Sequence, residues 1–352
     1  MRALLVVNPI ATATTQRIRD VLVSALAADL SVDVVMTKGR GHAAELAERA
    51  ADNGLDLVVA LGGDGTVNEI ANGLLRSGPA PGVPALAVVP GGSTNVFARA
   101  LGYSASPVEA TGELLEALRD GRSRRIGLGH ATFTSSAGLS QSRWFTFCAG
   151  FGLDAAVVEQ VERKRVHGRR NTPGLYLRSA LGRFIRNTGR RCPPISVTTG
   201  ESSQPGGPDE LMATQTATAQ AQAQARNTTL PDYPSQLALM PEQVLAAVVC
   251  NTTPWTYLNA RPVRACPDAS FDAGLDLVGL RRLTVATTTR SVLQMLHGSR
   301  GPQGRHILAL HDQARIALTA AQAIPLQLDG EYIGPQTELT VRSMPSALRV
   351  IV

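Results

Sequence analysis

The most constraining feature of the sequence is an apolar run, residues 57–61, that leads directly into a glycine-rich turn at residues 62–66. A helical pattern, residues 67–75, follows the turn. A strand, a tight turn and a helix in this order are typical of a parallel sheet covered by helices. The start of such a helix presents free N–H groups and a positive dipole end, so this turn predicts a phosphate-binding site.

One residue of the turn, Asp64, does not suit a phosphate site by itself, because a carboxylate repels phosphate. It fits where a divalent cation or a basic side chain lies between the carboxylate and the phosphate. A turn with several glycines also has a simpler interpretation, since glycine is common in turns of every kind. The turn alone therefore leaves both interpretations open.

Length and composition set the outer limits. The chain has 352 residues, which is long for one average domain, so we expect two. No apolar run reaches the roughly 18–20 residues that span a bilayer, and the four cysteines have no metal-binding spacing. We therefore expect a cytoplasmic protein with reduced thiols. The net charge of +6 favours anionic partners such as nucleotide phosphates or acidic lipid surfaces.

Strand-like and helical segments alternate through the N-terminal part of the chain, with strands expected at residues 3–7, 32–36, 57–61 and 85–89. This alternation predicts a parallel sheet, in which ligands bind beyond the carboxyl ends of the strands. Polar loops follow all four strands, so they can converge on one ligand. These loops contain Asn8 and Pro9, then Thr37, then the glycine-rich turn, then Gly92, Ser93, Thr94 and Asn95.

The remainder of the chain has a different pattern. Short strand-like runs follow one another from about residue 144 to residue 328, which predicts a second, mainly antiparallel domain. Residues 200–234 are rich in Ala, Gln, Thr and Ser, and we expect a flexible insert there. Residues 161–191 carry many arginines and few acidic residues. They fit either a helix on an anionic bilayer or a solvated surface helix; nucleic acid is the weaker interpretation because no binding motif accompanies the charge.

The whole string of residues 62–69, GGDGTVNE, resembles the nucleotide-binding signature of the diacylglycerol kinase catalytic family, which includes sphingosine kinases and bacterial soluble lipid kinases. Phosphofructokinases and NAD kinases share the GGDG core. Other stretches that resemble the lipid kinases are Asn8-Pro9, Thr37 followed by Gly41-His42-Ala43, and the loop PGGSTN at residues 90–95. The resemblance implies an N-terminal parallel-sheet α/β nucleotide-binding domain, residues 1–126 completed by about 336–352, and a β-rich lipid-substrate domain of β-sandwich type, residues 127–335.

The resemblance also implies the cofactors, ATP and Mg²⁺. Asp64 is the expected metal anchor, and Asp272 is a second candidate in a stretch similar to a structural magnesium site of some relatives. Val96, Gly127 and Ala273 stand where the family has acidic residues, which puts metal binding in doubt. The residues implied to contact the nucleotide are Asn8, Pro9, Thr37, Gly62, Gly63, Asp64, Gly65, Thr66, Asn68, Glu69, Gly92, Ser93, Thr94 and Asn95.

Near the C-terminus, an apolar strand ends in Asp329-Gly330-Glu331. Such a turn can be an ordinary hairpin. In the lipid kinases, however, the Asp-Gly-Glu turn lies at the domain cleft and one of its acids is a base. We expect Glu331 to lie nearer the lipid hydroxyl and Asp329 to support it.

The implied reaction is ATP-dependent phosphorylation of a lipid hydroxyl, on diacylglycerol or a related lipid such as a sphingoid base, at the inner membrane face. An NAD kinase-like enzyme and a phosphofructokinase are alternatives, although each is expected to have other loops than PGGSTN and Asp-Gly-Glu. A non-catalytic lipid-binding protein of the same fold is a third alternative, because acids are absent at Val96, Gly127 and Ala273. The oligomeric state stays open between a monomer and a homodimer.

Overall fold

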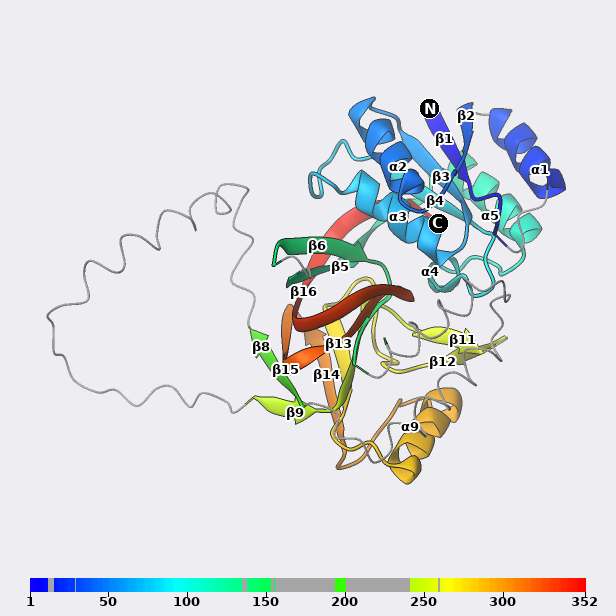
Figure 1. Ribbon diagram of the computed structural model, residues 1–352. Helices are drawn as coiled ribbons and strands as arrows, with labels where there is room; N and C mark the ends of the chain where they lie inside the picture. The colour runs from blue at the N-terminus through cyan, green and yellow to red at the C-terminus, as the bar shows by residue number, and fades with distance from the viewer. Residues whose placement is uncertain are drawn as a thin grey trace, which may run out of the picture.

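The computed structural model describes residues 1–11, 16–28, 30–134, 138–152, 155, 194–200, 241–258 and 260–352. The predicted basic segment 161–191 lies outside these residues, as does the predicted insert 200–234 apart from Gly200. Most of the described strands belong to one sheet, and Figure 1 shows the helices of the N-terminal part gathered at one end of it.

The N-terminal part alternates strands and helices as predicted. β1 pairs with β2 and β3, and β3 pairs with β4, all in parallel. Helix α2 packs on α3, and α1 packs on α5. The elements are β1 (Arg2–Val7), α1 (Gln16–Ala27), β2 (Ser31–Met36), α2 (His42–Asp52), β3 (Leu57–Gly62), α3 (Asp64–Leu74), β4 (Ala85–Pro90), α4 (Val96–Ala100) and α5 (Pro107–Arg119).

The central strands of this part are buried along their whole length. Every residue of β3 and β4 is buried, which explains why both strands are continuous apolar runs without polar alternation. At the edge of the sheet β2 is largely exposed. Helix α5 begins with Pro107 after Ser106, whose side chain accepts the Glu109 N–H, so its start is set by local sequence.

The second part is mainly antiparallel, with β7, β10, β13, β14 and β15 paired in that manner. Helix α9 was not predicted. The elements are β5 (Ser123–Thr134), β6 (Ser140–Phe145), β7 (Cys148–Phe151), β8 (Ile195–Gly200), β9 (Glu242–Val244), β10 (Ala246–Cys250), β11 (Thr256–Leu258), β12 (Arg261–Val263), β13 (Leu275–Leu280), α9 (Val285–His297), β14 (Ile307–Gln313), β15 (Arg315–Leu328) and β16 (Glu331–Ile351).

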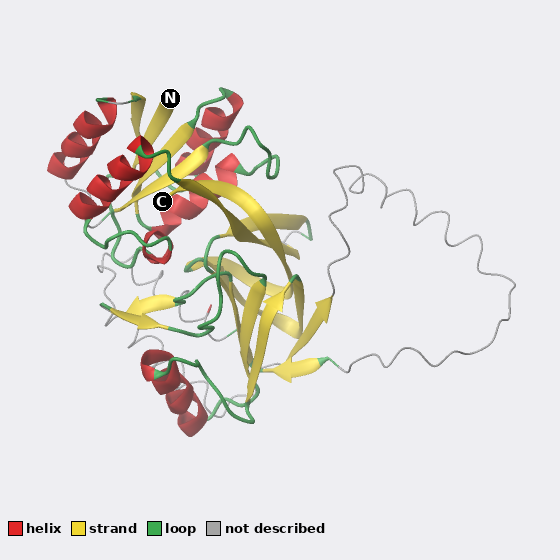
Figure 2. Ribbon diagram, turned by 180° about the vertical axis from the view of Figure 1, so that it is seen from behind, coloured by secondary structure: helices red, strands yellow, loops and turns green. Residues whose placement is uncertain are grey.

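The long strand β16 joins the two parts. It pairs antiparallel with β15 and β5, and Val350 near its end pairs in parallel with Leu86 of β4. Two large apolar cores lie on either side of this connection: one runs from Ala3 to Leu128 and includes residues 347–351, and the other lies between Ala131 and Val341. The predicted fold class, α/β followed by a β-rich part, is confirmed, and both sets of strands share one continuous sheet (Figure 2).

The helices of the described segments are all too short or too polar to cross a bilayer.

Candidate functional site

The loops at the carboxyl ends of β1, β2 and β3 are tied together by hydrogen bonds. The Asn8 Nδ2 donates to Thr66 Oγ1 at 3.0 Å, and the Asn8 backbone N–H donates to Leu61 O at 2.9 Å. The Thr37 N–H donates to Val7 O at 2.8 Å. Three of the expected nucleotide residues, Asn8, Thr37 and Thr66, therefore lie at one edge of the sheet, as their positions after strands predicted.

The glycine loops after β3 and β4 contact each other directly. The Gly91 N–H donates to Gly62 O at 2.7 Å. A Cβ atom at Gly92 would lie 2.7 Å from the Cα of Gly63, and one at Gly62 would lie 2.7 Å from Thr66 Oγ1. A side chain at Gly92 would force the two loops apart, so this glycine allows their approach, whereas Gly62 leaves room for the Thr66 side chain.

Three helices, α2, α3 and α4, begin at this edge. Two acidic side chains of α3 accept hydrogen bonds from backbone N–H groups at the starts of α2 and α4. Glu69 accepts hydrogen bonds from the N–H groups of Gly41 and Ala43 at the start of α2, at 2.9 and 3.2 Å. Asp64 Oδ1 accepts the Phe97 N–H at the start of α4, at 3.0 Å. Helix α3 itself has no capping side chain. Of these three helices, α3 is therefore the one whose N-terminus can bind an added anion.

The charge of Asp64 is affected by its surroundings in two opposing ways. Burial is the largest effect and raises the pKa of Asp64 to about 6. The N–H groups of Phe97, Val96 and Asn95 act in the other direction, because they stabilise the charged carboxylate. A cation near Asp64 would also favour the charged form.

The PGGSTN loop is held by its own asparagine. Asn95 Oδ1 accepts the Gly92 N–H at 2.8 Å, and Asn95 Nδ2 donates to Gly92 O at 2.9 Å. Asn95 adopts a left-handed conformation with φ of 50°. Ser93 and Pro9 are exposed at the same edge, and Thr94 is partly buried.

Asn68 connects helix α3, which follows the glycine-rich turn, to the Asp-Gly-Glu turn. Its side chain is buried, and its Nδ2 donates to Asp329 Oδ2 at 2.7 Å and to Trp144 O at 3.0 Å. Its Oδ1 accepts a hydrogen bond from Arg143 at 2.9 Å. Asn68 therefore lies between the two parts of the chain. The resemblance implied that this residue contacts the nucleotide.

Asp329 is buried and fully engaged. Its Oδ2 accepts hydrogen bonds from the backbone N–H and the hydroxyl of Thr146, at 2.6 and 2.8 Å. Its Oδ1 accepts the N–H groups of Phe147 and Cys148, at 2.9 and 3.0 Å. Burial raises the pKa of Asp329, while these hydrogen bonds oppose the shift. The arrangement suits a positioning role, because both oxygens already have donors.

Glu331 has a different environment. Its two carboxylate oxygens form ion pairs with Arg40, in the loop before α2, and Arg143 of β6. A hollow of about 490 Å³ lies beside this group, and its lining has both polar and apolar side chains. Sequence reasoning missed both arginines; Arg40 lies in the loop that follows Thr37, whereas nothing in the local sequence marks Arg143. The hollow is lined by Arg40, Phe133, Gln141, Ser142, Arg143, Tyr332 and Ile333.

The expected metal residues differ in how well they fit Mg²⁺. Asp272 pairs with Arg124 at 3.2 Å and is mostly exposed, so its partner is a cation and the structure does not support a metal role for it. Among the described residues, no group of three or more His, Cys, Asp and Glu side chains could hold a metal ion. Mg²⁺ that binds with nucleotide phosphates needs only one or two protein carboxylates. Asp64 fits that requirement.

At two positions where the resemblance implied acidic residues, the structure has tightly packed nonpolar residues. Val96 is buried and contacts Phe147 and Cys148. A Cβ at Gly127 would lie 2.8 Å from the Phe271 carbonyl oxygen, so a side chain does not fit there. These contacts replace the charged network that the family pattern implied.

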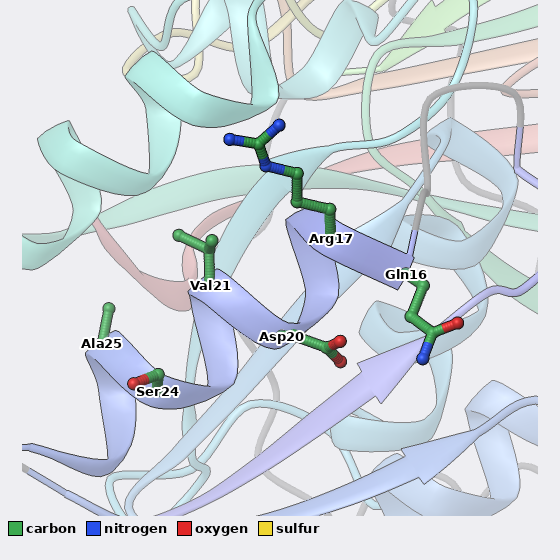
Figure 3. A pocket seen from close by; sticks show the side chains of 6 residues that line it. All are labelled: Gln16, Arg17, Asp20, Val21, Ser24 and Ala25. Atoms are coloured by element: carbon green, nitrogen blue, oxygen red, sulfur yellow. The ribbon is translucent and has the colours of Figure 1, made fainter.

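A second hollow is separate from the site. It is a shallow depression along one side of α1, and none of the site residues lines it (Figure 3). Its lining is Gln16, Arg17, Asp20, Val21, Ser24 and Ala25.

Comparison with known proteins bears on both parts of the chain. A diacylglycerol kinase of Bacillus subtilis is 43% identical over 89 residues, which is 25% of this chain and 27% of that protein. A diacylglycerol kinase of Staphylococcus epidermidis is 34% identical over 110 residues, 31% of this chain and 33% of that protein. The matched stretches thus span a third or less of these relatives.

The fold as a whole also has solved counterparts. A diacylglycerol kinase from Bacillus anthracis has a TM-score of 0.62 at 17% identity, with 99% of this chain and 96% of that chain covered. A second structure from the same organism, with the same coverage, reaches 0.67 at 20% identity. At these identities the likeness shows the shared fold.

The family model named Diacylglycerol kinase catalytic domain matches residues 2–131, the part that contains the glycine-rich loop, the PGGSTN loop and α2 to α5. The predicted resemblance is thereby confirmed. Residues 2–131 are thus similar to the diacylglycerol kinase catalytic domain family.

Proposed function

We propose that this chain is an ATP-dependent lipid kinase, which transfers the γ-phosphate to a hydroxyl of diacylglycerol or a related lipid such as a sphingoid base. The observation that carries the proposal is the Asn68–Asp329 hydrogen bond of 2.7 Å. It joins helix α3, which follows the glycine-rich turn in the matched family region, to the Asp-Gly-Glu turn near the other end of the chain. A phosphate site and a candidate base are thus neighbours.

The nucleotide phosphates bind at the N-terminus of α3. The backbone of Gly62–Gly63 and the open start of the helix supply N–H donors, and Thr94 of the second loop supplies a hydroxyl. Phosphoryl transfer depends mostly on positioning and on neutralising charge. Magnesium, held with the phosphates by Asp64, would supply part of that neutralisation.

Glu331 would accept the proton of the lipid hydroxyl as the hydroxyl oxygen attacks the γ-phosphorus, the bond from this phosphorus to the bridging oxygen breaks, and ADP leaves. To do so, one carboxylate oxygen has to leave its arginine. Arg40 is the arginine that yields, because its side chain is 62% exposed whereas that of Arg143 is 23% exposed. Arg143 stays in place through its second hydrogen bond, to Asn68 Oδ1.

The test is an incubation of the full chain with γ-labelled ATP, magnesium and a total lipid extract, followed by identification of any labelled lipid. We expect a labelled lipid with the wild type and loss of labelling with Asp64→Ala, which removes the organiser of α4 and of the cation. Absence of labelled lipid with the wild type would contradict the proposal. A parallel incubation with NAD in place of the lipid extract tests the NAD kinase-like alternative, which would label NAD.

A lipid-binding protein without turnover is the second candidate. It is favoured by Gly127, where a side chain would meet the Phe271 carbonyl, and by Val96, which is packed in an apolar cluster where the family pattern has an acid. In that case the same incubation yields no product although lipid still binds to the purified chain.

A further inference from the structure

Helix α9 lies at the periphery of the second part, at the opposite end of the molecule from α1 (Figures 1 and 2). Only Ser291 and Met295 of its residues are buried. The side of the helix that carries these two residues packs next to β12. In addition, the Arg264 N–H donates to Met295 O at 2.8 Å. The other residues of the helix are exposed, apart from the partly buried Thr287, Thr288, Gln294 and Leu296.

Apolar side chains are exposed on one outward face. Val285, Val292 and Leu293 are 56%, 38% and 52% exposed. Residues seven and eight apart lie on the same side of an α-helix, so the three form one apolar stripe. Met295 and, in part, Leu296 pack into the small core beside β12, so the stripe borders the attached side of the helix.

The segment that contains this stripe carries only basic charged side chains. The sequence from 281 to 306 contains no Asp or Glu. Arg281 pairs with Glu242 at 2.8 Å. The other arginines of this stretch, Arg282, Arg290, Arg300 and Arg305, are exposed. An apolar stripe bordered by arginines is complementary to an anionic lipid surface, which accepts apolar side chains and attracts the cations.

We propose that α9 is a membrane-docking helix that lies in the surface of an anionic bilayer, with Val285, Val292 and Leu293 in the lipid and the arginines at the headgroups. This inference deepens the proposed lipid kinase function, since it names the surface that meets the substrate membrane. The hairpin β11–β12 lies between α9 and α4 in both views, and Arg99 of α4 lies 3.2 Å from the centre of the Tyr257 ring of β11. A bilayer at α9 therefore lies beside the hairpin that contacts the nucleotide-binding part.

The test is co-sedimentation of the full chain with vesicles of phosphatidylcholine alone or mixed with phosphatidylglycerol. We expect binding to the anionic vesicles that falls with salt. Arg290→Gln with Arg300→Gln should weaken it about 25-fold, at about fivefold for each arginine near the surface. Val292→Gln with Leu293→Gln should weaken it at least about tenfold, because two apolar side chains no longer enter the lipid.

Matched controls use exposed residues of other helices and strands. Val21→Gln with Val108→Gln changes apolar residues that are 52% and 65% exposed on α1 and α5. Arg17→Gln with Arg349→Gln removes the same charge from the N-terminal part and from β16. Both control pairs should bind as the wild type does. Thermal melting of every variant identifies loss of fold, and the arginine pair tests the surface without changing any apolar side chain.

Three results would overturn the inference: equal binding of the wild type to neutral and anionic vesicles, wild-type binding by both α9 pairs, or α9 variants that change only self-association in sedimentation velocity. Vesicle binding needs no turnover. If the wild type binds through α9 but phosphorylates no lipid, the proposed function fails and the docking surface stands. If the α9 variants lose vesicle binding but phosphorylate detergent-dispersed lipid normally, both stand.

Discussion

At the scale of single residues, Asp329 and Glu331 show how two acids in one turn acquire different roles. Asp329 is inside, where Thr146, Phe147, Cys148 and Asn68 donate to it. Glu331 lies toward the surface between two arginines. A buried acid with every oxygen satisfied holds the turn, whereas an acid at the edge of a hollow can meet a substrate.

The difference predicts separate effects of substitution. Glu331→Gln should lower kcat by about 10²–10⁴-fold, the usual loss when a general base is removed, with little change in ATP binding or melting temperature. Asp329→Asn should lower both activity and stability, since an amide NH₂ would face N–H donors at a cost of about 1–3 kcal/mol for an unsatisfied group. Steady-state kinetics measure the change in kcat, and thermal melting measures the change in stability. The roles would be reversed if Glu331→Gln kept a normal kcat while Asp329→Asn was inactive and as stable as the wild type. Asp329 would then be the base and Glu331 the supporting acid.

At the scale of elements, α3 organises the edge of the sheet. Its acids Asp64 and Glu69 satisfy the N-termini of α4 and α2, while its own N-terminus stays open beside the two glycine loops. The helix therefore fixes the positions of its neighbours and leaves the anion site at its own start.

The glycines of these loops give a matched pair for testing this arrangement. Gly92→Ala should destabilise the chain by about 1–3 kcal/mol, as overpacking does, because its Cβ would lie 2.7 Å from the Gly63 backbone. Gly65→Ala should be neutral or slightly stabilising, since a Cβ at Gly65, within α3, meets nothing within 4 Å. Chemical denaturation of both variants measures the difference. Equal stability of the two would show that the loops do not require their close approach.

At the scale of the whole molecule, the two apolar cores meet at β16 and at Asn68. The strand carries the chain from the second core back to β4, and Asn68 connects α3 with β6 and with the turn before β16. This junction is where the proposed phosphate site and the proposed base would come together, so we expect its rigidity to affect both stability and activity.

Asn68→Ala tests the junction. It removes the donor to Asp329 and the acceptor for Arg143, both partly or fully buried, so we expect a loss of about 1–3 kcal/mol in the free energy of unfolding. Activity should fall further than stability, because the turn and the glycine loop lose their common contact. Asn72→Ala, one turn along α3, is the comparison: it removes hydrogen bonds to Trp144 and to Asn68 Oδ1 but leaves the donor to Asp329 in place. Equal loss of activity in the two variants would contradict a specific role for Asn68.

Local sequence determined much of the N-terminal part. The apolar runs at β3 and β4 and the glycines after them predicted strands, loops and the edge where Asn8, Thr37 and Thr66 meet, because each depends on neighbours in the chain. The antiparallel character of the second part was predicted in the same manner. Helix α9 was missed, since its threonines and valines favour strands; the Thr284–Thr287 capping box and the packing of Met295 decide its conformation.

Only the tertiary structure decided how the polar residues of the site are used. Glu69 and Asp64 serve helix N-termini, Asp329 is buried, and Arg40 and Arg143 hold Glu331. The physical reason is separation along the chain: Asn68 and Asp329 bond across 261 positions. A local pattern gives the chemistry of a side chain, but the donors and charges around it come from segments that only the folded sheet brings together.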